Sequence, residues 1–522
     1  MKLPFLQSQI VESIYCLQQN KCQIHIKDIA DKLGYSAISK LLLNNLQNLA
    51  NKKVVIIEKR SSEIEFYRLT PDANDFLDKI YLHRQQEEIF SPKSDYIKIL
   101  NKSDNVQLNL FDKDNICEIE QNKLVHEWYP YLEGFSPSLI HEKLKIYGIS
   151  REATVLDPFC GSGTTLVTCK MHGIDSIGVD ANPLMKLVSE VKTTWDYDID
   201  KLHYQICSLI ISLTQGFKKI SQSQVKIEDD WLKKMPQKEL DSWLRPRLQK
   251  EAAFSKYLIS KIKDKKIASL IKIIMGKALF DASNVVLAPG TCFYPYQNKE
   301  SFYDLFCQKL IQVYKDIKLL STNNCDYGKS SIFCGDSRKI DQILPINSVD
   351  FLICSPPYPN DLEYTTHTRL ELYLWDFANS MNDILAVKKN MVCGSTKLIW
   401  NNKNNEKYIS EFQEIIKITS EMNSRLSDKN WGFNYPRMVR EFFGDMFLVM
   451  ENSFKILKPG AISLWVVGDQ SVKGVLVPVG KLLAEIGERI GYSCEGIELL
   501  RVRRSTGAIR YLNEEIVILK KK

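Results

Sequence analysis

A glycine-bearing turn after a short apolar strand most constrains the fold of this 522-residue chain. Residues 154–156 form the strand, residues 157–165 form the turn, and the apolar positions that follow continue as a helix. Gly161 and Gly163 let a ligand approach the backbone closely. Open α/β sheets bind ligands at the carboxyl ends of their strands, so the turn predicts such a sheet with a ligand site there.

The next expected strand, residues 176–179, ends in Asp180. An acid about 20 residues beyond a glycine turn is the arrangement that binds a ribose diol. Two adjacent strand ends therefore predict a nucleoside pocket. The G-x-G-x-x-G spacing of dinucleotide oxidoreductases is absent, because Gly163 is followed by Thr164, Thr165 and Leu166, and this disfavours an oxidoreductase.

Residues 157–164 read Asp-Pro-Phe-Cys-Gly-Ser-Gly-Thr, and this turn resembles the cofactor motif of the DNA amino-methyltransferase superfamily (cytosine-N4 and adenine-N6). The resemblance covers most of residues 124–522. It implies a Rossmann-like sheet that binds S-adenosyl-L-methionine, with Asp180 on the ribose and Asp336, after the strand 331–334, on the adenine amino group. The implied cofactor-binding residues are Asp157, Pro158, Phe159, Gly161, Ser162, Gly163, Thr164, Asp180, Ala181, Asp336 and Ser337.

A second motif follows the buried strand expected at residues 349–354: Ser355, Pro356, Pro357 and Tyr358. Two prolines end the strand's hydrogen bonding and stiffen the loop. The exocyclic nitrogen of a base is a poor nucleophile, and acceptors at the Ser355 hydroxyl and the Pro356 carbonyl suit its N–H groups while Tyr358 stacks on the ring. These four residues are the predicted catalytic residues. The base must be flipped out of the duplex to reach them.

Serine at the first position of the tetrad resembles cytosine-N4-specific, site-specific DNA methyltransferases. Methylation of a ring carbon needs a nucleophilic thiol, usually in a Pro-Cys pair, and the chain has no such dipeptide, so Cys160 and Cys354 are expected to pack in the core. The resemblance thus implies methyl transfer to N4 of cytosine in double-stranded DNA, within a restriction-modification or defence system. The sequence leaves open whether a companion restriction endonuclease belongs to that system.

Three alternatives stay open. Asparagine or aspartate at the first tetrad position is more typical of adenine-N6 DNA enzymes and of guanine-N2 RNA enzymes, but one residue does not decide the base. The chain could also be a winged helix regulator with an inactive methyltransferase domain. Asp157, Asp180 and Asp336 together with the complete tetrad argue against an inactive domain.

The fold is expected to be α/β, with an N-terminal winged helix domain and a helical insertion. Three helical patterns and two strand patterns, residues 54–58 and 64–69, predict a winged helix-like domain over 1–84, which either contacts DNA or serves in docking. A polar linker follows over 85–123, and the catalytic domain covers 124–522. Within the catalytic domain, a mainly helical insertion at 195–328 and residues 384–438 are the two candidates for target recognition.

The C-terminal pattern supports the same sheet. A strand at 461–467, a helix at 478–490 and strands at 495–503 and 515–519 predict a terminal antiparallel hairpin. The cofactor turn precedes the tetrad, whereas many Ser-Pro-Pro-Tyr enzymes have the reverse order.

Composition restricts the possible partners and metal sites only weakly. A formal charge of +7 permits a polyanionic partner without requiring one. The 13 cysteines include no Cys-x-x-Cys pair and the 7 histidines do not cluster, so no metal site is expected. No signal peptide is evident and no apolar run reaches about 18 residues. We therefore expect no membrane contact and a cytoplasmic location in a bacterium or archaeon.

Overall fold

The computed structural model divides the chain into two compact units, residues 1–107 and 108–522. The described residues are 55–61, 64–69, 124–130, 135–221, 231–285, 300–322, 325–427, 429, 432, 434–505, 509 and 511–522. The helices expected in the first 50 residues and the linker expected at 85–123 lie outside this set, so the winged helix stays a prediction.

The first unit contributes one described feature, an antiparallel hairpin. Strand β1 (Val55–Ser61) pairs with β2 (Ile64–Leu69) from Val55 opposite Leu69 to Ser61 opposite Ile64, with an irregularity after Lys59. Both strands fall where the alternation of apolar residues predicts them.

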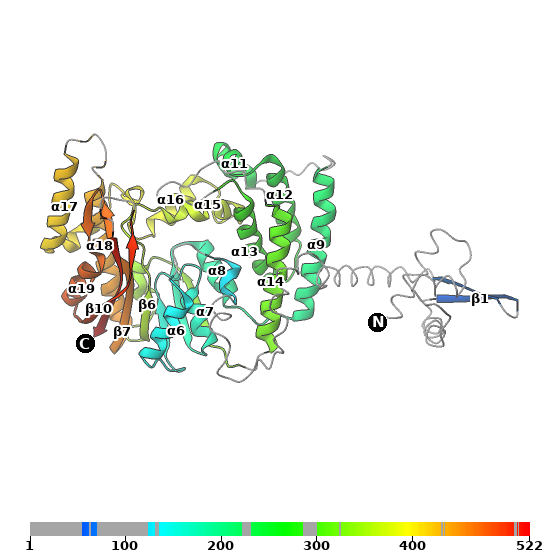
Figure 1. Ribbon diagram of the computed structural model, residues 1–522, viewed down its shortest axis with the longest axis horizontal. Helices are drawn as coiled ribbons and strands as arrows, with labels where there is room; N and C mark the ends of the chain where they lie inside the picture. The colour runs from blue at the N-terminus through cyan, green and yellow to red at the C-terminus, as the bar shows by residue number, and fades with distance from the viewer. Residues whose placement is uncertain are drawn as a thin grey trace. The chain divides into compact units, whose positions relative to one another are not determined.

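The second unit is built on a sheet with the strand order β10-β11-β7-β6-β3-β4-β5 in the described part of the chain (Figure 1). Five neighbouring strands, from β7 to β5, are parallel; β11 runs antiparallel to β7 and to β10. The strands are β3 (Thr154–Asp157), β4 (Asp175–Asp180), β5 (Ser330–Cys334), β6 (Val349–Cys354), β7 (Leu457–Gly468), β10 (Tyr492–Arg504) and β11 (Tyr511–Lys521). The expected α/β sheet and its terminal hairpin are confirmed.

The strand order places a topological switch point beside β3. From β3 the chain proceeds to β4 and then β5 on one side, and returns to β6 on the other side of β3. Ligands of open α/β sheets bind at such a point, outside the carboxyl ends of the strands. Asp157 ends β3, Asp180 ends β4 and Cys354 ends β6.

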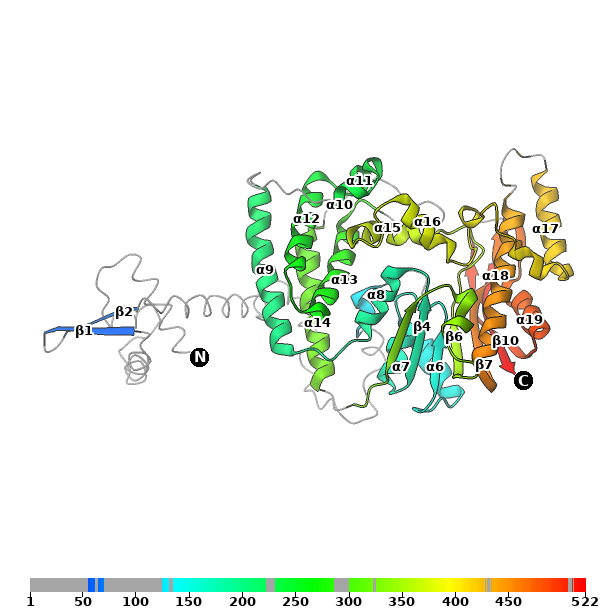
Figure 2. The same cartoon turned by 180° about the vertical axis from the view of Figure 1, so that it is seen from behind.

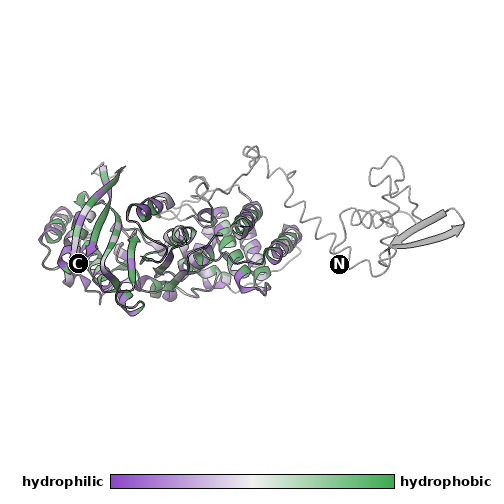
Figure 3. Cartoon of the chain, turned by 90° about the horizontal axis from the view of Figure 1, so that it is seen from below, coloured by the Kyte–Doolittle hydropathy of each residue, from purple (hydrophilic) through white to green (hydrophobic). Residues whose placement is uncertain are grey.

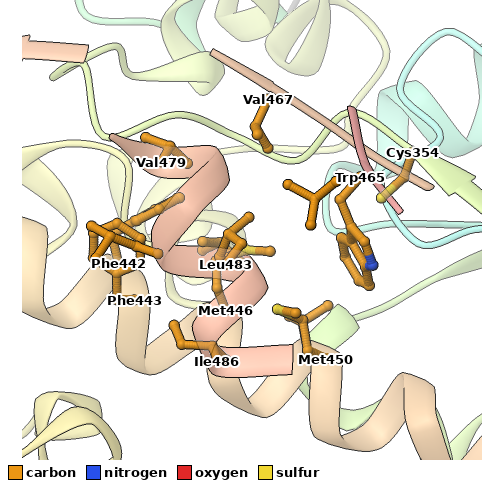
Figure 4. Packing of buried hydrophobic residues seen from close by; sticks show 14 of the residues in the cluster. Cys354, Phe442, Phe443, Met446, Met450, Trp465, Val467, Val479, Leu483 and Ile486 are labelled. Carbon is orange, nitrogen blue, oxygen red and sulfur yellow. The ribbon is translucent and has the colours of Figure 1, made fainter. Parts of the chain in front are cut away.

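Helices cover both faces of the sheet, which explains why its central strands are almost continuously apolar. Phe351 and Ile353 of β6 face a core formed with α6 (Pro137–Ile146) and α7 (Thr164–Met171). The alternate residues Leu352 and Cys354 face the opposite core, where α18 and α19 pack. Figure 4 shows Cys354 and Trp465 among residues of these two helices, and in Figure 3 helices carry hydrophilic and hydrophobic residues together, as expected for amphipathic elements.

The described part of the long connection between β4 and β5 is mainly helical. Helix α13 packs against α8 (Pro183–Lys192) and α14, and Figure 2 shows this group of helices at the opposite end of the unit from α17–α19. The group consists of α9 (Ile199–Ser221), α10 (Trp231–Lys234), α11 (Gln237–Trp243), α12 (Pro246–Ser260), α13 (Lys265–Ala282) and α14 (Phe302–Thr322).

No helix in the described ranges is long and apolar enough to cross a membrane.

The remaining elements follow β6 or are short. These elements are α15 (Tyr364–Leu374), α16 (Met381–Lys389), α17 (Gln413–Leu426), α18 (Tyr435–Ile456), α19 (Val479–Ile490), the strands β8 (Gln470–Val472) and β9 (Val475–Val477), and the 3-10 turns η3 (His126–Trp128), η4 (Ser337–Gln342), η5 (Thr396–Leu398) and η6 (Asn405–Ile409).

Candidate functional site

A pocket opens at the switch point and encloses about 1000 Å³, part of it open to solvent. The pocket brings together both predicted motifs, which are about 190 residues apart in the chain. The predicted site residues that line it are Asp157, Phe159, Gly161, Ser162, Thr164, Asp180, Ala181, Ser337, Ser355, Pro356, Pro357 and Tyr358.

The glycine turn is held by the neighbouring strand end. Gly163, with φ +79°, caps the start of α7, and a Cβ there would lie 2.9 Å from the Ser189 hydroxyl. Asp180 accepts hydrogen bonds from the amide of Gly161 at 2.9 Å and from that of Asn182 at 2.7 Å. The carboxylate of Asp180 therefore joins the ends of β3 and β4.

Asp157 is a buried carboxylate that organises the turn from inside. It accepts hydrogen bonds from the Thr165 hydroxyl at 2.5 Å and from the Phe159 amide at 3.0 Å. Burial raises the pKa of Asp157 to about 7 and, by the same cause, the pKa of Asp180 to about 6. Among the described residues, no lysine or arginine lines the pocket to neutralise them.

These features fit S-adenosylmethionine, which carries a sulfonium and an ammonium group. A cationic ligand would stabilise the ionised forms of Asp157 and Asp180, whose burial otherwise opposes ionisation. The apolar side chains of Phe159, Met185 and Val392 line other parts of the wall. The lining therefore combines acidic groups for a cation with apolar surface for a flat ring.

At the end of β5, Asp336, which the resemblance assigns to the adenine of the cofactor, is paired with an arginine. Both carboxyl oxygens accept from Arg338, at 2.8 Å from Nε and 2.9 Å from Nη2, and Arg338 also contacts Asp445 at 3.1 Å. Asp336 does not line the pocket, but its neighbour Ser337 does, and the Ser337 hydroxyl donates to the Pro158 carbonyl at 2.5 Å. Pro158 and Gly163 also stay behind the pocket wall and shape the turn.

The tetrad follows β6 directly and faces the same pocket. Ser355 is half-buried and Tyr358 is buried, with 3.1 Å between their hydroxyl oxygens. The guanidinium carbon of Arg503, near the end of β10, lies 6.0 Å from the centroid of the Tyr358 ring. Tyr358 is thus packed against a cation from the terminal hairpin, a contact that the sequence did not indicate.

Part of the wall was not predicted. Asn390, Met391 and Val392 line the pocket although they follow the tetrad by more than 30 residues, and Tyr364 lines it from the start of α15. Asn182 could have been recognised from the sequence, because an Asn-Pro pair is typical of the start of a helix. The pair begins α8, and the Asn182 side chain accepts a hydrogen bond from the Leu184 amide at 3.0 Å. No local pattern marks residues 390–392.

The cysteines near the site are buried thiols. Burial raises the pKa of Cys160 and of Cys354 well above the ordinary value. Neither side chain is therefore activated as a nucleophile, in agreement with the expected packing role. Within the described ranges, no group of three or more His, Cys, Asp or Glu residues is placed to hold a metal ion.

The segment before α6 meets the pocket only in part. Phe135 lines the pocket, whereas the Trp128 indole donates to Asp316 of α14 at 2.7 Å and the Tyr129 hydroxyl donates to Glu371 of α15 at 2.6 Å. Trp128 and Tyr129 thus anchor this segment to helices.

Comparison with known proteins finds similarity to DNA methyltransferases. The model of a DNA methylase family of N6- and N4-methyltransferases matches residues 12–190. Type II methyltransferase M.BsoBI of Geobacillus stearothermophilus is 25% identical over 83% of this chain and 91% of its own length. M.AvaI of Nostoc sp. is 24% identical over 73% of this chain and 82% of its own length.

Two more distant matches add little. Type II methyltransferase M.MjaII of Methanocaldococcus jannaschii is 24% identical over 48% of this chain and 62% of its own length. The solved structure of human N-acetylserotonin methyltransferase with its cofactor aligns over 99% of this chain and 94% of that chain at 7% identity, but its TM-score of 0.19 is too low to bear on the fold. The family model and the Type II relatives together support the N4/N6 DNA methyltransferase superfamily, with S-adenosylmethionine as the methyl donor.

Proposed function

We propose that the protein is a site-specific DNA methyltransferase that methylates N4 of a flipped-out cytosine. The observation that carries this proposal is the single pocket in which Ser355, Pro356 and Tyr358 face the turn that begins at Asp157. Serine at the first tetrad position favours cytosine. Type II methyltransferases among the relatives favour a restriction-modification system with a companion endonuclease.

The cofactor would be held by Asp157, Phe159, Gly161, Asp180 and Ser337. When bound, it supplies an activated methyl group, so the protein's task is alignment rather than strong base catalysis. These residues come from the ends of three adjacent strands. Their positions are fixed by the sheet before any ligand binds.

The tetrad would hold the target amine. The Ser355 oxygen and the Pro356 carbonyl are acceptors for the two N–H groups, and accepting both weakens delocalisation of the nitrogen lone pair into the ring. When Ser355 accepts from the amine, its own hydrogen can point to the Tyr358 hydroxyl 3.1 Å away. This direction of hydrogen bonding orients the Ser355 lone pairs toward the base. Flipping the base costs about a few kcal/mol, which DNA contacts must offset.

The test is the base composition of DNA exposed to the protein. The wild type and Ser355→Ala are expressed in a host that lacks DNA methylation, and the DNA is digested to nucleosides for mass spectrometry. We expect N4-methylcytosine with the wild type alone. N6-methyladenine would instead establish the adenine alternative, methylated RNA beside unmodified DNA would establish an RNA enzyme, and no modification would favour an inactive regulator. Sequencing of the modified sites would then test site specificity.

We also propose the domain organisation given by the sequence: a winged helix-like domain over 1–84, a linker over 85–123 and a catalytic domain over 124–522. The β1–β2 hairpin supports the wing. Limited proteolysis is expected to cut within 85–123. Protection of that segment together with cleavage inside 124–522 would contradict these boundaries.

A further inference from the structure

Asp361, three residues beyond Tyr358, is a half-buried carboxylate surrounded by hydroxyl and amide donors. One oxygen accepts from the Ser395 hydroxyl at 2.9 Å and from the amide and hydroxyl of Thr396, both at 2.8 Å. The other oxygen accepts from the Tyr435 hydroxyl at 2.7 Å. One side chain thus connects the tetrad loop, the 395–396 segment and the start of α18.

The backbone reinforces this connection. The Asp361 amide donates to the Gly394 carbonyl at 2.9 Å. A Cβ at Gly394 would lie 2.7 Å from the Tyr358 carbonyl oxygen, so a larger residue there would displace the tetrad. Asp361 itself has φ +64°, a conformation that L-residues rarely adopt and that its hydrogen bonds help to hold.

The 394–396 segment continues directly from the pocket wall. Asn390, Met391 and Val392 line the pocket, and the Gly394 amide donates to the Val392 carbonyl at 2.9 Å. Asp361 therefore fixes the tetrad loop relative to this wall. Its own side chain does not line the pocket, which separates it from groups that touch the ligand.

The charge of Asp361 suits this role. Burial alone would raise its pKa, but the hydrogen bonds from Thr396, Tyr435 and Ser395 outweigh burial and hold the pKa below the ordinary value. Among the described residues, no ion pair occupies this carboxylate. The carboxylate accepts hydrogen bonds from neutral donors in the 395–396 segment and at the start of α18. Such charge-assisted hydrogen bonds are short and directional.

This inference rests on the proposed function. We propose that Asp361 is a positioning residue for methyl transfer. Through its hydrogen bonds with Ser395, Thr396 and Tyr435, it holds Ser355 and Tyr358 in a fixed position relative to the segment 390–396. Displacement of a reacting group by about 1 Å can lower a rate by about 100-fold. Loss of the Asp361 contacts should therefore lower kcat much more than it weakens cofactor binding.

The main experiment compares Asp361→Asn with Asp361→Ala in the full-length protein. Asparagine keeps one acceptor oxygen for Ser395 and Thr396, so we expect kcat to fall by about fivefold, whereas alanine removes all four bonds and should lower kcat by about 50- to 100-fold. The Kd for S-adenosylmethionine, measured by calorimetry, should change by less than about threefold in both, since Asp361 does not line the pocket.

A matched pair of tyrosines controls for general loss of stability. Tyr435→Phe removes the hydrogen bond to Asp361, and Tyr492→Phe removes a buried hydrogen bond to the Met450 carbonyl at 3.0 Å, made by a residue that does not line the pocket. Each variant removes one hydrogen bond; the bond to the Asp361 carboxylate is charge-assisted, whereas the bond to the Met450 carbonyl joins neutral groups. We expect Tyr435→Phe to lower kcat by about three- to fivefold and Tyr492→Phe to leave it within about 1.5-fold. If Asp361→Ala fails to fold, this pair decides the question.

Hydrogen exchange distinguishes failure of this inference from failure of the proposed function. Peptides covering 355–362 and 390–396 should exchange faster in Asp361→Ala than in the wild type, whichever substrate the enzyme methylates. Unchanged exchange and unchanged kcat in folded Asp361→Ala would overturn the positioning role. Faster exchange in a protein that methylates neither DNA nor RNA would reject the proposed function and leave the structural link in place.

Discussion

The two halves of the pocket are held together in different ways. On the cofactor half, Asp157 and Asp180 accept hydrogen bonds from residues between 2 and 19 positions away, so the ends of β3 and β4 largely hold each other. On the tetrad half, Asp361 accepts from residues 34, 35 and 74 positions away, and Arg503 approaches Tyr358 from the terminal hairpin. The first half is local in sequence and the second is assembled from distant segments.

The halves also differ in electrostatics. The cofactor half contains two buried carboxylates whose pKa values are raised by burial, whereas the tetrad presents the neutral hydroxyls of Ser355 and Tyr358. A cation is therefore favoured on one side and a neutral, hydrogen-bonding amine on the other. If this division is correct, substitutions in one half should change cofactor binding and substitutions in the other half should change kcat.

The largest effect is expected for Asp180→Ala, which removes the acceptor for the Gly161 amide in the glycine turn and for the Asn182 amide after β4. Hydrogen bonds to charged groups contribute about 1.5–3 kcal/mol each, so affinity for S-adenosylmethionine should fall by at least about 100-fold. Isothermal titration calorimetry measures this loss, with Asp341→Ala as a control because Asp341 lies outside the pocket. Wild-type affinity in folded Asp180→Ala would remove the basis for separating the two halves.

The second effect concerns pH and the ligand-free protein. Because burial raises the folded-state pKa of Asp157 from 3.8 to about 7, the folded state binds a proton that the unfolded state releases. This contribution to stability is complete below pH 3.8 and is lost as pH rises through about 7. From pH 5 to 7 the free energy of unfolding should fall by about 2 kcal/mol through Asp157.

Urea denaturation at several pH values measures this slope. Asp157→Asn lacks the titrating group, so its stability should fall less steeply between pH 5 and 7, the remaining slope coming partly from Asp180. Identical slopes in the two proteins would mean that Asp157 is not a buried carboxylate of raised pKa.

The same contrast explains what the sequence could predict. The strands ending at Asp157, Asp180 and Cys354 were predicted from apolar runs followed by turn residues, and the topology of a parallel sheet then brings their ends together. The tetrad was predicted for the same reason, since two prolines after a strand mark its end.

What escaped prediction depends on contacts between distant segments. The wall at 390–392 and the approach of Arg503 to Tyr358 require the path of the chain after β6, which local periodicity does not specify. The pairing of Arg338 with both carboxyl oxygens of Asp336 was likewise not predicted, although the two residues are only two positions apart.

A smaller effect, now on the tetrad half, is expected for Tyr358→Phe. This change keeps the ring and removes the hydroxyl that lies 3.1 Å from the Ser355 oxygen. One neutral hydrogen bond contributes about 0.5–1.5 kcal/mol, so kcat should fall by about three- to tenfold while the Kd for S-adenosylmethionine stays within about twofold. Single-turnover kinetics with saturating DNA measures the rate. If Tyr358→Phe changed only the affinity for S-adenosylmethionine, Tyr358 would act in cofactor binding and not in the tetrad half.

The smallest effect is expected for Arg503→Met, which keeps most of the aliphatic side chain and removes the guanidinium beside the Tyr358 ring. Arg503 also donates to the Asp469 carbonyl at 3.1 Å, and Gly468 leaves room for it, because a side chain there would collide with the guanidinium. A cation–π contact contributes about 0.5–1 kcal/mol at an exposed site. The rate of methyl transfer at saturating DNA should therefore fall by about two- to fivefold, with unchanged cofactor affinity. Arg489→Met is the control, since Arg489 pairs with Glu411 on the surface of α19 and does not line the pocket. Equal rates for the two variants would show that the terminal hairpin does not help to hold Tyr358, and the tetrad half would then depend on Asp361 and its partners without support from β10.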